Sequence, residues 1–240
     1  MSEWNRKNLE IMKTKYLIPA VLLLALQFAS CEQSEANALT NESMEVSIDE
    51  LAAIAAFTTD SNAITQSEID GLLLMREEEK MAQDVYDSFY STYKVINFDR
   101  ISNSETRHTA AILALINHFE LTDPALTTPG KFSSTDIQGL YDKLVAAGTS
   151  ANTALSTGAF IEEYDIADLK KLIAETTNAD IITVYTNLLR GSENHLRAFV
   201  RTLKIRGVVY SPQILKSTDF ATIIAATNTT RGGRGSYCGN

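Results

Sequence analysis

The chain has 240 residues, of which 45% are hydrophobic and 21% are charged, and its formal net charge is −9. This composition is typical of a globular protein, and an acidic chain without a basic stripe argues against a nucleic-acid binder. Only two cysteines occur, Cys31 and Cys238, so neither a disulfide framework nor a structural zinc site built on cysteine pairs is expected.

The first 30 residues have the pattern of a secretory signal peptide. Four basic residues precede an apolar run over residues 16–28, which is short for a membrane span. Met12, just before this run, offers an alternative start. The placement of Cys31 after Phe-Ala-Ser resembles a bacterial lipobox, which implies cleavage before Cys31, lipidation of its sulfur and anchoring to a membrane of the cell envelope, periplasmic or at the cell surface. Phe28 departs from the usual Leu, and simple secretion with an incidental cysteine is the alternative.

Residues 31–66 are polar and acidic and are predicted to form a flexible tether. Within it, residues 47–57 are expected to form a short helix, because Ser47 and Glu50 have the spacing of a capping box. At the other end of the chain, the Gly-rich tail 227–240 is expected to be disordered.

The region between residues 67 and 226 is predicted to be one all-α domain, because Gly and Pro are sparse and no alternating strand pattern persists. The first long helix begins with Ser67 and Asp70 as a partial capping box, and the fourth ends at Gly207, a C′ glycine. A loop with two prolines and a short helix connect the second long helix to the third, as in a four-helix bundle with a crossover. The expected long helices span residues 67–93, 100–119, 151–176 and 179–205, and the short ones lie at 135–147 and within 213–226.

Each long helix places at least one potential metal ligand on its apolar face. Glu79 shares a stripe with Met75 and Tyr86, and an acid on such a stripe is costly unless its charge is compensated. Glu105 and His108 are three residues apart and lie side by side on the second helix. Three carboxylates and two imidazoles suit iron or manganese. The inward-facing set is Glu79, Glu105, His108, Glu162 and His195.

The fourth helix departs from the ligand pattern of di-iron bundles, in which two helices each supply a Glu and two each supply a Glu-x-x-His pair. Ser192, not Glu, precedes His195 by three residues. Glu193 is about 200° of helical rotation from His195, so both face inward only if a π-bulge near Gly191 re-aims one of them. Without such a bulge, the second metal position lacks a ligand.

Other polar residues near these positions are expected to have structural or surface roles. Glu77 and Glu78 are assigned to a solvated face, and Glu163, which lines up with Lys170, to a more exposed one. Glu163 and Glu193 are therefore the less favoured ligands.

Three further side chains are expected to have ordinary structural roles. His118, near a helix end, is expected to be structural or exposed, and Tyr86 to pack in the core, with contact to a ligand as its less common role. Arg197 is expected to pair with an acid, for which Asp165 and Asp168 are the candidates.

Four blocks of sequence occur in order between residues 65 and 210. They are Arg-Glu-Glu-Glu-Lys-Met-Ala-x-Asp-Val-Tyr, Ser-Glu-Thr-Arg-His-Thr, Ile-Glu-Glu-x-Asp-Ile-x-Asp-Leu and Gly-Ser-Glu-Asn-His-Leu-Arg-Ala-Phe. These blocks resemble the DUF2202 family, a ferritin-like family of unassigned function, and the first also resembles rubrerythrin-type proteins. The resemblance implies a ferritin-like four-helix bundle in which the five inward-facing residues are metal ligands, with Ser192 as the departure.

Two functional hypotheses follow. The first is an exported metal-binding protein whose di-iron, or iron and manganese, centre performs redox chemistry with dioxygen, peroxide or Fe(II), as a ferroxidase or peroxidase would. The second is a non-catalytic, lipid-anchored helical binding module with a degenerate or mononuclear metal site, which Ser192 favours.

Overall fold

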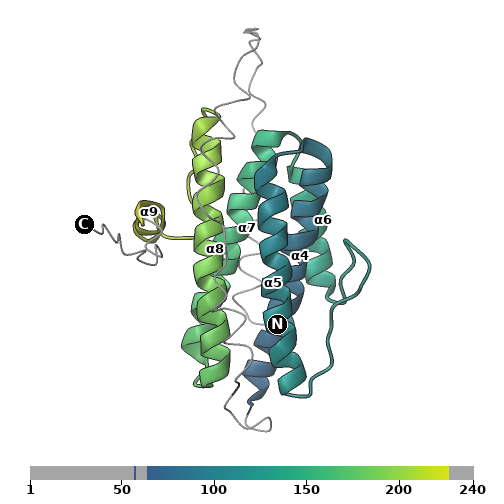
Figure 1. The fold of residues 1–240 in the computed structure, drawn as a ribbon. Helices are drawn as coiled ribbons and strands as arrows, with labels where there is room; N and C mark the ends of the chain where they lie inside the picture. Colours follow the sequence, from purple (N-terminus) through teal and green to yellow (C-terminus); the bar gives the residue numbers. More distant parts are fainter. Residues whose placement is uncertain (1–56, 58–63, 227–240) are drawn as a thin grey trace, which may run out of the picture. The chain divides into compact units, whose positions relative to one another are not determined.

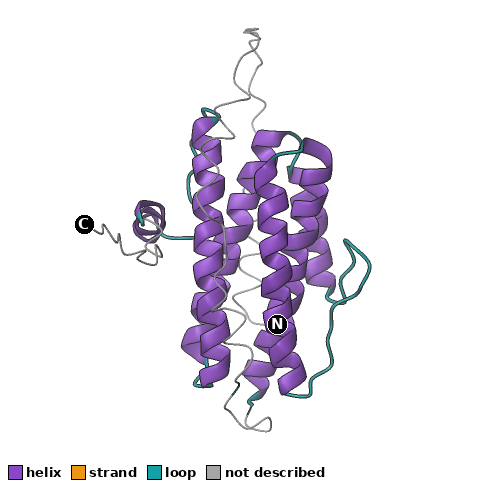
Figure 2. Cartoon of the chain, viewed as in Figure 1, coloured by secondary structure: helices purple, strands orange, loops and turns teal. Residues whose placement is uncertain are grey.

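The computed structural model describes Phe57 and residues 64–226. The predicted signal peptide, Cys31, most of the tether and of its short helix, and the tail 227–240 lie outside these residues. The described part of the chain is all-helical and contains no strand, as predicted (Figure 2). Its helices are α4 (Gln66–Tyr93), α5 (Ile96–His118), α6 (Thr135–Ala147), α7 (Ala151–Glu175), α8 (Ala179–Ile205) and α9 (Ser217–Ala225).

The four long helices α4, α5, α7 and α8 pack side by side along their lengths (Figure 1). The most extensive contacts join α4 to α5 and α7 to α8, and contacts of α4 with α7 and of α5 with α8 join the two pairs. The short α6 lies in the connection between α5 and α7 and packs on both α4 and α7, whereas α9 contacts α8. None of these described helices is long and apolar enough to cross a membrane.

The helix ends follow from local hydrogen bonds. The capping box of α4 is formed by Thr65 and Glu68, not by Ser67 and Asp70, because the Glu68 carboxylate accepts from Thr65 N at 2.8 Å while the Thr65 side chain accepts from Glu68 N. Helix α5 begins at Ile96, earlier than predicted, because left-handed Lys94 (φ 53°) turns the chain at once. Gly207 (φ 74°) follows the last turn of α8, as predicted for a C′ glycine.

Two apolar clusters occupy the interior of the bundle, and each draws on at least three of the long helices. One includes Leu72, Met75, Ile112, Leu115 and Leu188, all of them buried. The other is a group of contacting aromatic rings from α4, α5 and α8: Tyr86, Phe89, Phe98 and Phe199. On α4, α5 and α8, the residues predicted as metal ligands lie between these two clusters along the sequence.

We expect the substitution Gly158→Ala to destabilise the protein. A Cβ at Gly158 on α7 would lie 2.6 Å from Cζ of Phe199, whose ring is held by Tyr86 and Phe98 at centroid distances of 5.4 and 5.7 Å. Overpacking of this kind costs about 1–3 kcal/mol, and urea unfolding should show the loss.

Gly139→Ala is the matched control, because no heavy atom lies within 4 Å of a Cβ added to this helical glycine. It should raise the free energy of unfolding by about 0.5–1 kcal/mol, the difference in helix propensity between Ala and Gly. Equal stability of Gly158→Ala and the unmodified protein would contradict the packing described for Phe199.

Candidate metal centre

The structure brings all five predicted ligands together in the interior of the bundle. Helix α4 supplies Glu79, α5 supplies Glu105 and His108, α7 supplies Glu162, and α8 supplies His195. Each of these side chains is only 2–3% exposed. Burying five ionisable groups at one level of the bundle costs free energy of folding unless they compensate one another's charges or hold a cation.

The Glu105 carboxylate lies at the centre of the group. Its Oε2 is 2.8 Å from His108 Nδ1, and its Oε1 is 2.9 Å from His195 Nδ1. On the outer sides, Glu79 Oε2 is 3.2 Å from His108 Nδ1 and Glu162 Oε2 is 3.4 Å from His195 Nδ1. The two imidazoles stack with their centroids 5.4 Å apart and their planes 25° apart.

These contacts define two groups of three candidate ligands that share one residue. Glu79, Glu105 and His108 offer donor atoms within 4.8 Å of one another, and so do Glu105, Glu162 and His195. Each group could hold a metal ion, with one oxygen of Glu105 directed at each. Carboxylate oxygens and imidazole nitrogens are donors that iron and manganese accept.

The hydrogen bonding of the group fits a bound cation. Glu79 Oε1 is buried without a hydrogen-bond partner, and His195 Nδ1 approaches Glu105 without the alignment of a hydrogen bond. Unsatisfied buried polar atoms are rare in proteins. Donors about 2.1 Å from one ion and at right angles to each other lie about 3 Å apart, which matches the spacing of Glu105 from the two imidazoles.

Helix α8 remains a regular α-helix through Gly191, so the structure does not contain the π-bulge considered from the sequence. Gly191 instead makes room for the imidazole of α5, because a Cβ there would lie 2.5 Å from His108 Nε2. Glu193 turns away from the centre: its side chain is 29% exposed and lies 3.9 Å from Lys170 Nζ. His118 is also remote, with its ring between Phe57 and Phe119, in keeping with a structural role.

Mutual electrostatics set the protonation of these five side chains. Burial raises the pKa of Glu79 to about 8, against the effect of His108. Burial alone would lower the pKa of His195, but the carboxylates of Glu105 and Glu162 raise it to about 9. Burial would raise the pKa of Glu105, yet the two imidazoles hold it well below its usual range. Near neutral pH, an anionic Glu105 therefore lies between protonated imidazoles.

Tyr86 combines the two roles considered from the sequence. Its ring packs against Phe98 and Phe199, and its hydroxyl donates to Glu162 Oε1 at 2.5 Å. Burial and the Glu162 carboxylate raise the pKa of Tyr86 well above its usual value, so the hydroxyl stays a donor. This bond leaves the second oxygen of Glu162 facing His195.

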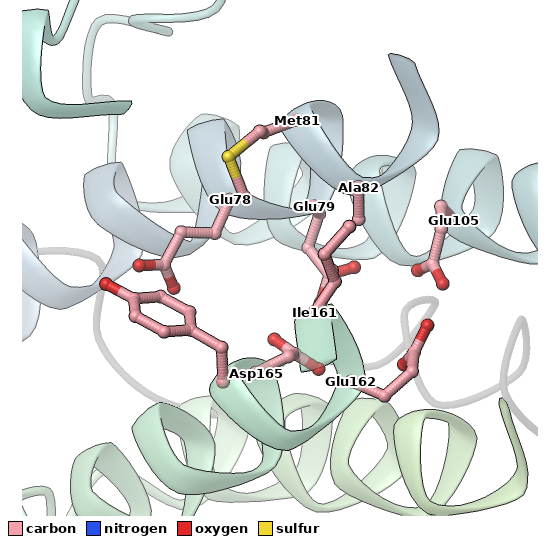
Figure 3. A pocket seen from close by; sticks show the side chains of 9 residues that line it. Glu78, Glu79, Met81, Ala82, Glu105, Ile161, Glu162 and Asp165 are labelled. Carbon is pink, nitrogen blue, oxygen red and sulfur yellow. The ribbon is translucent and has the colours of Figure 1, made fainter. Parts of the chain in front are cut away.

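A small cavity of about 10 Å³ lies beside the centre, and the residues lining it include five carboxylates (Figure 3). They are Glu78, Glu79, Glu105, Glu162 and Asp165. The prediction that Glu78 is solvated was wrong, since it is 3% exposed and its carboxylate makes no hydrogen bond within the described residues. Burial and the nearby Asp168 and Asp165 carboxylates raise its pKa well above the usual value.

Asp165 was missed as a residue of the site. It was expected to pair with an arginine, but it is 9% exposed and accepts a hydrogen bond from the Ser192 hydroxyl. Arg197 donates to the Ile223 carbonyl and to the Asn194 side chain. A usable signal was present, because Asp165 follows Glu162 by three residues, the same spacing that placed His108 beside Glu105.

Two acids next to the candidate ligands hold connecting segments through hydrogen bonds. Glu77, expected on a solvated face, is 5% exposed and accepts from the backbone N–H groups of Ser133 and Ser134, where α6 begins. Glu163, expected to be more exposed, is fully buried and accepts from the Tyr210 hydroxyl. Its carboxylate also accepts from the backbone N–H groups of residues 213–215, which explains why α9 begins only at Ser217.

Comparison with known proteins finds a matching family, a related protein and a similar solved structure. The family described as "Uncharacterized protein domain (DUF2202)" matches residues 68–227. The "Uncharacterized protein MJ0754" of Methanocaldococcus jannaschii is 43% identical over 166 residues, which cover 68% of this chain and 90% of that protein. The crystal structure of hypothetical protein MJ0754 superposes with a TM-score of 0.69 at 42% identity, covering 71% of this chain and 98% of the crystallised one.

We expect the metal-free protein to lose stability as the pH rises from about 5 to about 9. Glu79 titrates near 4.5 and His195 near 6.5 in ordinary surroundings, but near 8 and 9 in the fold. Over this interval the folded chain retains protons that the unfolded chain releases, so the free energy of unfolding falls with pH. Thermal unfolding of the protein in the presence of a chelator should therefore show a melting temperature that falls across this pH range.

His195→Gln should flatten the upper part of this pH profile, whereas His118→Gln, outside the centre, should leave the profile unchanged. Metal loading should remove much of the loss, because a cation replaces the protons. A melting temperature of the chelated protein that stays constant or rises between pH 6 and pH 9 would contradict the protonation described here.

Proposed function

The chain belongs to the DUF2202 family, and we propose that it forms a ferritin-like bundle holding a dinuclear centre of iron or manganese for redox chemistry with dioxygen, peroxide or Fe(II). One observation carries this proposal: Glu105 belongs to both three-residue ligand groups and directs one oxygen to each. A carboxylate in that position is suited to bridge two ions. Such a pair of ions supplies electron transfer and oxygen activation when bound.

The remaining residues of the site supply positions and a dry environment. His108 and Glu79 complete one ion site, and His195 and Glu162 complete the other. Tyr86 fixes the orientation of Glu162 through its hydroxyl, as residues behind metal ligands commonly do. Apolar side chains on both sides of this level, with Leu72 and Phe199 fully buried, exclude water from the ligands.

The place of action that we propose follows from the sequence. The signal-peptide pattern and Cys31 support an exported protein that is tied by a lipid to a membrane of the cell envelope. The tether over residues 31–66 would then separate the helical domain from that membrane.

Metal stoichiometry tests the proposal. The purified protein, stripped of metal and then titrated anaerobically with Fe(II) or Mn(II), should bind about two ions per chain. Glu105→Gln should bind at most about one ion, because the bridging charge is lost while the shape is kept. Glu193→Gln, a change of the same kind at a partly exposed acid, should bind as the unmodified protein does.

Redox function is tested on the same samples. The iron-loaded protein should consume dioxygen or peroxide faster than Glu105→Gln does. Binding of two ions without any such reaction would favour the non-catalytic binding module. If neither iron nor manganese binds, the proposed metal centre is wrong.

A further inference from the structure

The four long helices do not contribute equally to the centre. On α5, Glu105 precedes His108 by three residues, and on α8 the same position relative to His195 is held by Ser192. The di-iron bundle pattern has four carboxylates, two from single Glu residues and two from Glu-x-x-His pairs. The ligand groups of this chain contain three, so one donor is missing on α8.

The hydrogen bond of the Ser192 hydroxyl identifies the residue that could replace the missing carboxylate on α8. Ser192 is 1% exposed, and its Oγ donates to Asp165 Oδ2 from the adjacent helix α7. A serine Oγ stands where a glutamate at the same position would have its Cγ. The Asp165 carboxylate, one hydrogen bond beyond, therefore occupies space that the carboxylate of a Glu at position 192 would reach.

We propose that Asp165 is a further ligand of the metal centre, supplying from α7 the carboxylate that α8 lacks, with Ser192 as its positioning residue. This inference rests on the proposed function and specifies its ligand set. Asp165 would thereby join Glu162 as a second carboxylate from α7, and the hydrogen bond from Ser192 would select its orientation.

The surroundings of Asp165 support this assignment. Its side chain lines the same cavity as Glu79, Glu105 and Glu162, and in Figure 3 the α7 carboxylates face those of α4 and α5 across it. The unpartnered Glu79 Oε1 is also buried here, and about 10 Å³ is enough for one water or ion.

Charge balance favours a fourth carboxylate. Two divalent ions bring four positive charges into the buried site, whereas Glu79, Glu105 and Glu162 bring three negative charges. Buried charges are stable only when compensated, and ionised Asp165 would make the centre neutral with both imidazoles uncharged.

Glu78 lines the cavity too, but it belongs to its far side. Next to Glu79 on α4, it points about 100° away around the helix. In Figure 3, Glu78 lies at the end of the cavity away from Glu105 and Glu162, whereas Asp165 lies between Glu78 and these two residues.

Asp165→Asn tests the proposal, because it removes the charge but keeps the size and an acceptor for Ser192. In anaerobic titration with Fe(II) or Mn(II) alone, the unmodified protein should bind about two ions. The variant should bind its second ion about tenfold to a hundredfold more weakly, a loss of the size found when support of a metal ligand is removed. Asp168→Asn, a buried acid 2% exposed on the same helix, should bind both ions normally.

A second variant separates ligation from a folding defect. Asp165→Ser combined with Ser192→Glu moves the carboxylate back to α8 and should restore binding of the second ion. Unchanged binding of both ions by Asp165→Asn, or an equal loss in Asp168→Asn, would overturn the role of Asp165 while leaving the proposed function intact. Absence of binding by the unmodified protein would overturn both.

Discussion

The burial of the Glu105 carboxylate between two imidazoles is the constraint on which the arrangement of the helices depends. An anion that is 2% exposed is stable only if cations lie directly against it. Its two oxygens meet His108 from its own helix and His195 from α8, at 2.8 and 2.9 Å. Helices α5 and α8 must therefore approach closely, and Gly191 permits this because any larger residue would collide with His108.

The buried polar side chains of the candidate site lie between the two apolar clusters of the bundle. Two neighbouring acids fix the segments around the site through hydrogen bonds. Glu77 ties the segment before α6 to α4, while Glu163 ties the segment before α9 to α7. The helices that carry Glu79 and Glu162 are thus each fixed to a connection outside the four long helices. Such fixed positions suit a site whose ligands must keep their geometry when protons are exchanged for metal.

Much of the fold could be predicted from the spacing of apolar residues and from the residues that begin or end helices. Helices α6 and α8 have the predicted bounds, and the five inward-facing residues meet as their stripes predicted. The neighbours of the ligands were harder to predict. Glu78 and Glu163 are one residue, and Glu77 is two residues, from an inward-facing acid, and helical geometry alone places them outward.

Glu77 and Glu163 are buried because segments distant in sequence cover them, and periodicity within one helix gives no information about contacts of this kind. Residues 133–134 lie over Glu77, and residues 210–215 lie over Glu163. Asp165 differs, since its spacing from Glu162 marks an inward position. Its relation to Ser192 depends on the contact of α7 with α8, which only the tertiary structure specifies.

Anomalous diffraction from crystals of the manganese-loaded protein, measured at the manganese absorption edge, tests the central claim most directly. Our account predicts two peaks on either side of the Glu105 carboxylate, one next to Glu79 and His108 and the other next to Glu162 and His195. A single peak, or two peaks that do not share Glu105, would contradict the bridging role assigned to this residue.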